Sequence, residues 1–251
     1  MIDRYSPLSN LEVHALELTG YKGAFRYLGA HNFPDLHKGV TKEELAAFVH
    51  NGRKLVFIWE MDGNHVEYFT TTQGVTDAKY VLDELAWLGI PESLDICVYF
   101  SADFDAVSLA DYQAADDYLL AVEQTLDGKY ADGIYGDAGL LEYLFSGKAR
   151  SKPRHGWQSA GWDNGKAWKH AAAWQYAVEQ SVCGMTVDLS HVYFNPGWYP
   201  LDPKPVTKRA QKPAGPTYSL TVVNTYPTAK DASEKALEIA KLGFDVKVSQ
   251  N

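Results

Sequence analysis

Short apolar runs recur along the first 195 residues, with polar segments between them. Between several runs lie segments with helical periodicity, for which Thr41 and Thr76 are the expected N-caps of the first two. Strands that alternate with helices predict a parallel sheet. The strand-like runs are 2–6, 24–29, 54–62, 95–105, 131–137, 155–160, 172–177 and 186–193, and the helical segments are 41–52, 75–89, 108–126 and 138–147.

Eight strand-like runs in about 195 residues fit a closed barrel better than an open sheet. We therefore predict an α/β fold, namely a (β/α)8 TIM-like barrel over residues 1–199. The later connections are short, so we expect this barrel to lack some of its helices.

The remainder of the chain differs in character. Residues 200–216 contain five prolines and no apolar periodicity, which predicts a stiff exposed linker. Residues 217–251 alternate like a strand, then show a helical pattern that ends near Gly243, and then a second strand. This small βαβ unit is too short to bury a core alone. We expect it to pair with a second copy as a homodimer, to dock on the barrel, or to be half of a truncated module.

Charge narrows the classes of partner. The net charge is −9, with −13 on residues 1–203 (15 basic, 28 acidic) and +4 beyond (8 basic, 4 acidic). An acidic body argues against nucleic acid as the main substrate. No apolar run reaches the roughly 20 residues that a membrane span needs, and the first residues lack the apolar core of a signal peptide. We expect neither membrane insertion nor signal-dependent export.

The chain has two cysteines, Cys97 and Cys183, which we interpret as reduced structural thiols.

Polar residues gather where the predicted strands end. In a barrel of this kind the active site lies at the C-terminal ends of the strands. Acids and amides inside apolar runs are costly to bury without partners, so several of them at equivalent positions indicate a shared cleft. These residues are Asp3, Arg26, Tyr27, Glu60, Asp103, Asp105, Tyr135, Gln158, Gln175 and Asp188.

Paired carboxylates suit glycoside hydrolysis, in which one is a general acid with a raised pKa and the other a base, nucleophile or charge stabiliser. Asp103 and Asp105 are two residues apart, which predicts side chains on one face of the fourth strand, about 7 Å apart. Glu60, one strand over, could approach either. The many aromatic residues nearby suit either sugar stacking or a barrel core.

Other chemistries find less support. The chain has no HExxH motif, phosphate-binding loop or GxSxG elbow. His31 and His37 lack a third ligand, so we expect no metal and no cofactor. Neither cysteine has a histidine nearby in sequence, which weakens a papain-like amidase.

The ordered stretches VFIWE, VYFSADFDA, GIYGD, GWQSA, AWQYA and TVDLSHVY, with the Asp3 strand, carry a resemblance across residues 1–195. Together they resemble the glycoside-hydrolase-like barrel of actinobacterial secreted proteins and phage endolysins, a relative of the family 25 lysozymes. The resemblance implies cleavage of the peptidoglycan glycan strand, as a muramidase. In family 25 the fourth strand ends in Asp-x-Glu, whose Glu is the general acid. Here the matching residues are Asp103 and Asp105. Asp105 stands in place of the expected Glu, and its side chain is one methylene shorter, so Glu60 is an alternative acid.

The resemblance also implies that Asp3 and Asp188 line the substrate cleft, and that the substrate's own N-acetyl group can serve as nucleophile. We therefore predict three catalytic residues, Asp103, Asp105 and Glu60. The predicted substrate-binding residues are Asp3, Arg26, Tyr135, Gln158, Gln175 and Asp188.

Three hypotheses follow for function. The first is a phage-type endolysin that moves from the host cytoplasm to the cell wall at lysis, with peptidoglycan as its partner. Its tail, 217–251, weakly resembles the first half of a peptidoglycan-binding repeat. The second is a barrel that binds glycan without cutting it, and the third an amidase or peptidase acting on stem peptides.

Overall fold

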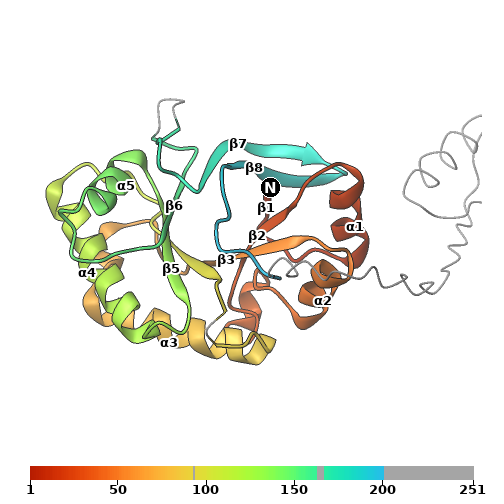
Figure 1. Ribbon diagram of the computed structural model, residues 1–251, viewed down its shortest axis with the longest axis horizontal. Coiled ribbons are helices and arrows are strands. Elements are labelled where there is room, and N and C mark those ends of the chain that lie inside the picture. Colours follow the sequence, from red (N-terminus) through yellow and green to blue (C-terminus); the bar gives the residue numbers. More distant parts are fainter. Residues whose placement is uncertain (93, 163–166, 201–251) are drawn as a thin grey trace, which may run out of the picture. The chain divides into compact units, whose positions relative to one another are not determined.

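A closed barrel of eight strands organises the protein (Figure 1). The computed structural model describes residues 1–92, 94–162 and 167–200, so the predicted βαβ unit and all of the predicted linker except Pro200 lie outside the described residues. The strands follow one another around the barrel in chain order, which confirms the predicted fold class. They are β1 (Ile2–Asp3), β2 (Gly23–Tyr27), β3 (Lys54–Trp59), β4 (Cys97–Ser101), β5 (Ala131–Gly136), β6 (His155–Gln158), β7 (Ala173–Val182) and β8 (Met185–Val192).

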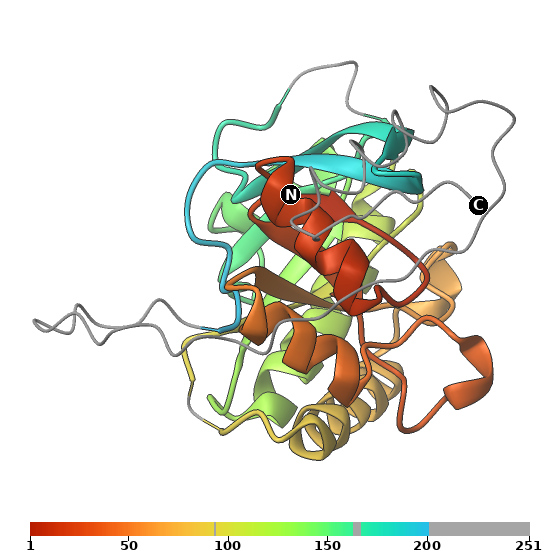
Figure 2. The ribbon, with the colours of Figure 1, turned by 90° about the vertical axis from the view of Figure 1, so that its right-hand side faces the viewer.

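Helices follow the first five strands and lie on the outside of the barrel (Figures 1 and 2). Among the described residues no helix follows β6, β7 or β8, as the short later connections predict. None of the described helices is both long and apolar enough to span a bilayer. The helices are α1 (Asn10–Leu18), α2 (Lys42–His50), α3 (Thr71–Leu88), α4 (Leu109–Leu126) and α5 (Ala138–Phe145), with 3₁₀ turns at η1 (Pro34–Leu36) and η2 (Val66–Tyr68).

Helix caps agree with the sequence only in part. Thr41 caps α2 as predicted, and its hydroxyl accepts a hydrogen bond from the Glu44 N–H at 3.1 Å. The expected cap Thr76 is wrong, because the N-cap of α3 is Thr70, six residues earlier. Gly74 has a low helix propensity, so the sequence pattern does not predict this first turn. A Cβ on Gly74 would lie 2.4 Å from the Tyr118 carbonyl oxygen, so the glycine permits close contact between α3 and α4.

The last strand corrects the expectation of an all-parallel sheet. β8 is antiparallel to both β7 and β1. Only Cys183 and Gly184 separate β7 from β8, and both have positive φ (51° and 78°). Two residues with positive φ form a hairpin turn, whereas a parallel crossover needs a dozen residues or more. The chain therefore reverses at this turn.

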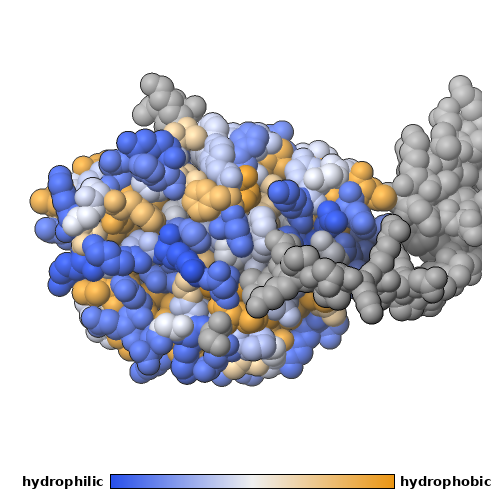
Figure 3. All heavy atoms as spheres, in the orientation of Figure 1, coloured by the Kyte–Doolittle hydropathy of each residue, from blue (hydrophilic) through white to orange (hydrophobic). Residues whose placement is uncertain are grey.

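Two apolar layers support the barrel. One lies between the strands and the helices and includes Leu16, Phe48 and Leu119. The other fills the barrel interior, where Phe25 stacks on Trp157 with ring centroids 4.0 Å apart. On the outer face shown in Figure 3, polar and apolar residues are interspersed.

Candidate active site

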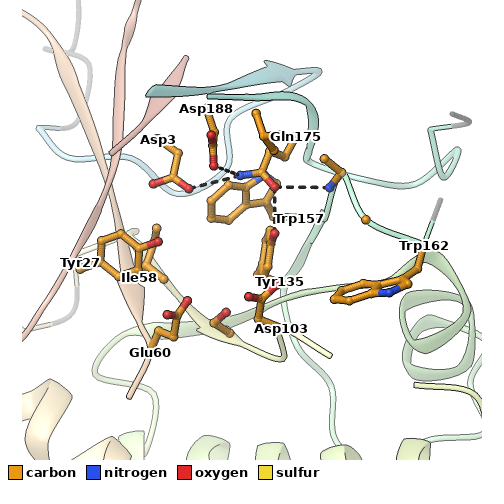
Figure 4. A pocket seen from close by; sticks show the side chains of 14 residues that line it. Asp3, Tyr27, Ile58, Glu60, Asp103, Tyr135, Trp157, Trp162, Gln175 and Asp188 are labelled. Carbon is orange, nitrogen blue, oxygen red and sulfur yellow. Dashed lines mark hydrogen bonds between the residues drawn. The ribbon is translucent and has the colours of Figure 1, made fainter. Parts of the chain in front are cut away.

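A pocket of about 270 Å³ opens where the strands β1 to β5 end (Figure 4). Strand register explains its walls, because neighbours in register point to the same face of a sheet. Tyr27 pairs with Ile58, and Ser101 with Tyr135, and all four side chains face inward. The lining residues are Asp3, Tyr27, Ile58, Glu60, Ser101, Asp103, Tyr135, Trp157, Ala160, Gly161, Trp162, Gln175, Val178 and Asp188.

Four carboxylates from four different parts of the barrel meet in this pocket. Asp3 on β1 and Asp188 on β8 are neighbours in register and lie on one side. Glu60, directly after β3, and Asp103, after β4, lie across the pocket from them (Figure 4). Asp3 is only 6% exposed, whereas Glu60 and Asp188 are half-buried. The site is thus two acid pairs on opposite walls.

Gln175 on β7 ties one of these pairs to the rest of the pocket. Its Nε2 donates to Asp188 Oδ2 at 3.0 Å and to Asp3 Oδ2 at 3.4 Å. Its Oε1 accepts from the Tyr135 hydroxyl at 2.8 Å and from the Ala160 N–H at 3.3 Å. A buried amide that satisfies acids and a phenol at once fixes the orientation of all three side chains.

We expect Gln175→Leu to lower the free energy of unfolding by about 1–3 kcal/mol, because it leaves buried polar groups without partners. Urea unfolding measures the change. Gln180→Leu is the matched control, since Gln180 is exposed on the same strand and its Nε2 donates only to the Val178 carbonyl among the described residues. Equal stability of the two variants would contradict the role assigned to Gln175.

A backbone distortion in β7 supplies a hydrogen-bond donor to Asp188. The β7–β8 pairing is irregular between Ala177 and Gln180, and Glu179 there has φ 54°. Positive φ is unfavourable for a residue with a Cβ and is often found at functional sites. In this conformation the Glu179 N–H donates to Asp188 Oδ1 at 2.8 Å. Asp188 is therefore held from both of its oxygens.

Burial and crowding favour the neutral forms of the first acid pair. Burial raises the pKa of Asp3 well above its usual range, the charge of Asp188 adds to this, and Arg26 opposes it. Burial also raises the pKa of Asp188, against the effect of the Glu179 N–H. Among the residues that the structure describes, none donates a hydrogen bond to the buried Oδ1 of Asp3. A carboxyl in that position favours its neutral form.

The second pair is shifted in the same direction. Burial raises the pKa of Glu60, an effect that Lys38 and the Ser101 hydroxyl oppose and the charge of Asp103 reinforces. Asp103 is an exposed residue, but partial burial of its carboxyl, together with the charge of Asp188, raises its pKa as well. A pocket with several raised carboxyl pKa values can hold a neutral acid beside an ionised one.

Six of the nine site residues predicted from sequence line this pocket, and Arg26, Gln158 and Asp105 do not. Those in the pocket are Asp3, Glu60, Asp103, Tyr135, Gln175 and Asp188.

Arg26 points outward from β2 into the helix layer. Its side chain is completely buried, and its Nε donates to Glu44 Oε1 at 2.7 Å. Its Nη atoms donate to the main-chain oxygens of Arg4, Tyr5 and Lys38. We therefore assign Arg26 to structure rather than to substrate.

Gln158 and Asp105 are also corrected. Gln158 is paired in register with Gly136 and faces outward, where it accepts a hydrogen bond from the Trp168 N–H. β4 ends at Ser101, so strand alternation does not extend to Asp105. Asp105 is exposed outside the pocket and lies near Asp137, whose pKa its charge helps to raise after the larger effect of burial.

Several lining residues escaped the sequence analysis, among them Ser101, Trp162 and Val178. Ser101 had a signal, because it alternates with Tyr99 and Asp103 in YFSAD. Trp162 lies in the β6–β7 connection and Val178 in the irregular part of β7, where no periodicity identifies a pocket residue. Within the described ranges, no group of three or more His, Cys, Asp or Glu side chains is arranged to hold a metal ion.

Comparisons with known proteins agree with this fold. A family model described as an Rv2525c-like, glycoside hydrolase-like domain matches residues 14–192. The protein YbfG of Bacillus subtilis is 29% identical over 157 residues, which are 53% of this chain. The match spans only about a fifth of that relative's length (21%).

Solved structures share the barrel at low sequence identity. The Tat-secreted protein Rv2525c of Mycobacterium tuberculosis, in complex with L-tartrate, has a TM-score of 0.66 at 19% identity, over 79% of this chain and 97% of that one. A B. stearothermophilus protein has a TM-score of 0.55 at 20% identity, over 78% and 96%. The modular autolysin LytC of Streptococcus pneumoniae has a TM-score of 0.50 at 14% identity, over 79% and 46%.

Proposed function

Because the chain belongs to the family of Rv2525c-like glycoside hydrolase-like domains, we propose that it is a glycosidase that cleaves the glycan strand of peptidoglycan, as a muramidase. One observation carries the proposal. Four carboxyl groups with raised pKa values share a single pocket at the C-terminal end of a barrel. Most glycoside hydrolases act through a neutral carboxyl and an ionised one at the scissile bond.

In this proposal Glu60 is the proton donor. Its carboxyl gives a proton to the glycosidic oxygen as the bond from that oxygen to the anomeric carbon breaks. Asp103, ionised, stabilises the positive charge that develops at the anomeric carbon. Water then bonds through its oxygen to the anomeric carbon and gives one proton to the Glu60 carboxylate, which restores the acid. The Asp3–Asp188 pair with Gln175 supplies hydrogen bonds to the substrate from the opposite wall. Asp105 has no role in the proposal, because it lies outside the pocket.

Peptidoglycan as substrate is supported by the resemblance to family 25 lysozymes and by the kinship of fold with an autolysin. We extend the proposal to an endolysin that is released from the host cytoplasm to the cell wall at lysis. The basic charge after Pro203 suits binding to an anionic wall.

The test uses the full chain and purified Gram-positive cell walls. We expect new reducing ends, and soluble fragments that mass spectrometry identifies as ending in a reducing N-acetylmuramic acid. Release of amino groups without reducing ends would instead support an amidase or peptidase. Binding to walls with no product would support a non-catalytic glycan-binding barrel.

Trp162 is the proposed sugar-stacking wall. It lines the pocket, is 44% exposed and has φ 58°, an uncommon backbone conformation for a bulky residue. Its ring lies at the pocket rim (Figure 4). We expect Trp162→Ala to raise KM about tenfold, the equivalent of about 1.4 kcal/mol of binding, with little change in kcat.

Steady-state kinetics on soluble glycan fragments measure this effect. Trp162→Phe is the matched variant, because it keeps a flat ring and should retain most of the affinity. A fall in kcat at constant KM in Trp162→Ala would contradict a role in binding.

A further inference from the structure

Lys38, in the connection between β2 and α2, is a buried cation behind the wall of the pocket. It is only 4% exposed, and its Nζ donates to the backbone oxygen of Glu60. The same ammonium group lies 5.0 Å from the ring centroid of Tyr27 and 5.9 Å from that of Tyr5. Burial lowers the pKa of Lys38, and the charge of Glu60 opposes this. Lysine is rarely buried to this degree without a specific partner.

The main chain around Lys38 is held tightly in place. The Lys38 carbonyl oxygen accepts from Arg26 Nη2 at 2.8 Å, and Arg26 is in turn paired with Glu44. A Cβ on the next residue, Gly39, would lie 2.1 Å from the backbone nitrogen of Ala30, so only glycine fits there. The loop therefore presents its ammonium group to Glu60 in a fixed position.

We propose that Lys38 is a positioning residue, which holds the backbone of Glu60 and places a positive charge near its carboxyl from behind the pocket wall. It does not line the pocket and is not assigned a contact with substrate. Its value for catalysis rests on the proposed function, in which Glu60 is the proton donor.

The sign of the effect follows from the groups around Glu60. Burial and the charge of Asp103 favour its neutral form, whereas Lys38 and the Ser101 hydroxyl favour the ionised form. The charges of Asp3 and Glu60 also disfavour each other. Lys38 is the one cation among the groups that act on the Glu60 carboxyl in the described chain. Without it, Glu60 should keep its proton to higher pH.

Three groups with titratable side chains face Lys38 itself. Glu60 approaches from β3, Tyr27 from β2 and Tyr5 from the segment after β1. The pKa of Tyr27 is raised well above its usual range, chiefly by burial, so its hydroxyl stays neutral across the pH range of an activity assay. The neighbour whose charge interacts with Lys38 is therefore Glu60.

The experiment compares three Lys38 variants in the full chain. Lys38→Met removes the charge and the donor, Lys38→Gln keeps an N–H donor without the charge, and Lys38→Arg keeps both. Lys42→Met is the matched control, since Lys42 is exposed and its Nζ lies over Trp87, 4.8 Å from the ring centroid. The first measurement is a carbon NMR titration of the Glu60 carboxyl, assigned by the loss of its signal in Glu60→Gln.

We expect the Glu60 titration, and the alkaline limb of the pH–rate profile, to move to higher pH by about one unit in the Met and Gln variants. The Arg variant and Lys42→Met should match the wild type. An unmoved titration in Lys38→Gln, or failure of both neutral variants to fold, would reject the proposal. If the titration moves but wild type releases no reducing ends, the inference about Lys38 stands and the muramidase function fails.

Discussion

Replacing Glu60 with Gln should reduce the release of reducing ends by about 10³-fold or more, with the barrel still folded. The amide is too weak an acid to transfer a proton to the leaving oxygen, and general acid catalysis contributes about 10²–10⁴-fold. Asp103→Asn should cause a comparable loss, because it removes the negative charge that stabilises the developing cation at the anomeric carbon. The measurement is the initial rate of reducing-end formation on purified cell walls, with thermal unfolding as the test of fold.

Asp105→Asn is the matched control for these variants. It makes the same chemical change as Asp103→Asn only two residues away, but at an exposed position outside the pocket. We expect it to keep nearly full activity. Inactive Asp105→Asn beside active Glu60→Gln would return the acid role to the residue that the lysozyme resemblance points to, and would overturn the assignment made from the pocket.

Replacing Arg26 with Met should lower the free energy of unfolding by about 3–5 kcal/mol. The change leaves the Glu44 carboxylate, which is almost fully buried, without its cation. Breaking a buried ion pair from one side is much more costly than replacing both partners. It also removes the donors to the main-chain oxygens of Tyr5 and Lys38. Urea unfolding at neutral pH measures the loss.

Lys129→Met provides the contrast, since Lys129 and Glu92 form an exposed pair at 2.9 Å. An exposed pair contributes about 1 kcal/mol or less. The double variant Arg26→Met with Glu44→Leu should recover part of the stability lost in Arg26→Met. If Arg26→Met proves as mild as Lys129→Met, Arg26 is not the structural residue described above.

The barrel could be predicted from the sequence because the prediction depends on the number and order of apolar runs along the chain, not on any single residue. Eight apolar runs separated by helical patterns persist even where single residues are ambiguous. The direction of β8 could also have been predicted. Only eight residues, 178–185, separate the runs 172–177 and 186–193, which is fewer than the dozen or more that a parallel crossover needs. The turn residues themselves, Cys183 and Gly184, are not the usual Asn-Gly pair.

The direction of individual side chains was harder to predict. Parallel strands are buried on both faces, so alternation does not say which face points inward. Arg26 and Tyr27 are adjacent on β2, and only the register with Phe57 and Ile58 shows that Tyr27 enters the pocket. The expected direction of the Asp105 side chain was wrong for a different reason. It assumed that the fourth strand continues to Asp105, whereas β4 ends at Ser101.

The reversed last strand determines where the protein can be attached to a surface or a label without blocking the pocket. β8 runs back toward the end of the barrel where the parallel strands begin, and the described chain then pairs Tyr199 with Leu55, near the start of β3. Lys54, the first residue of β3, donates to the Pro200 carbonyl at 2.9 Å. A parallel eighth strand would have brought the chain out beside the pocket. Instead a surface tether or a fluorophore placed at Pro200 would leave the mouth of the barrel free for a polymer.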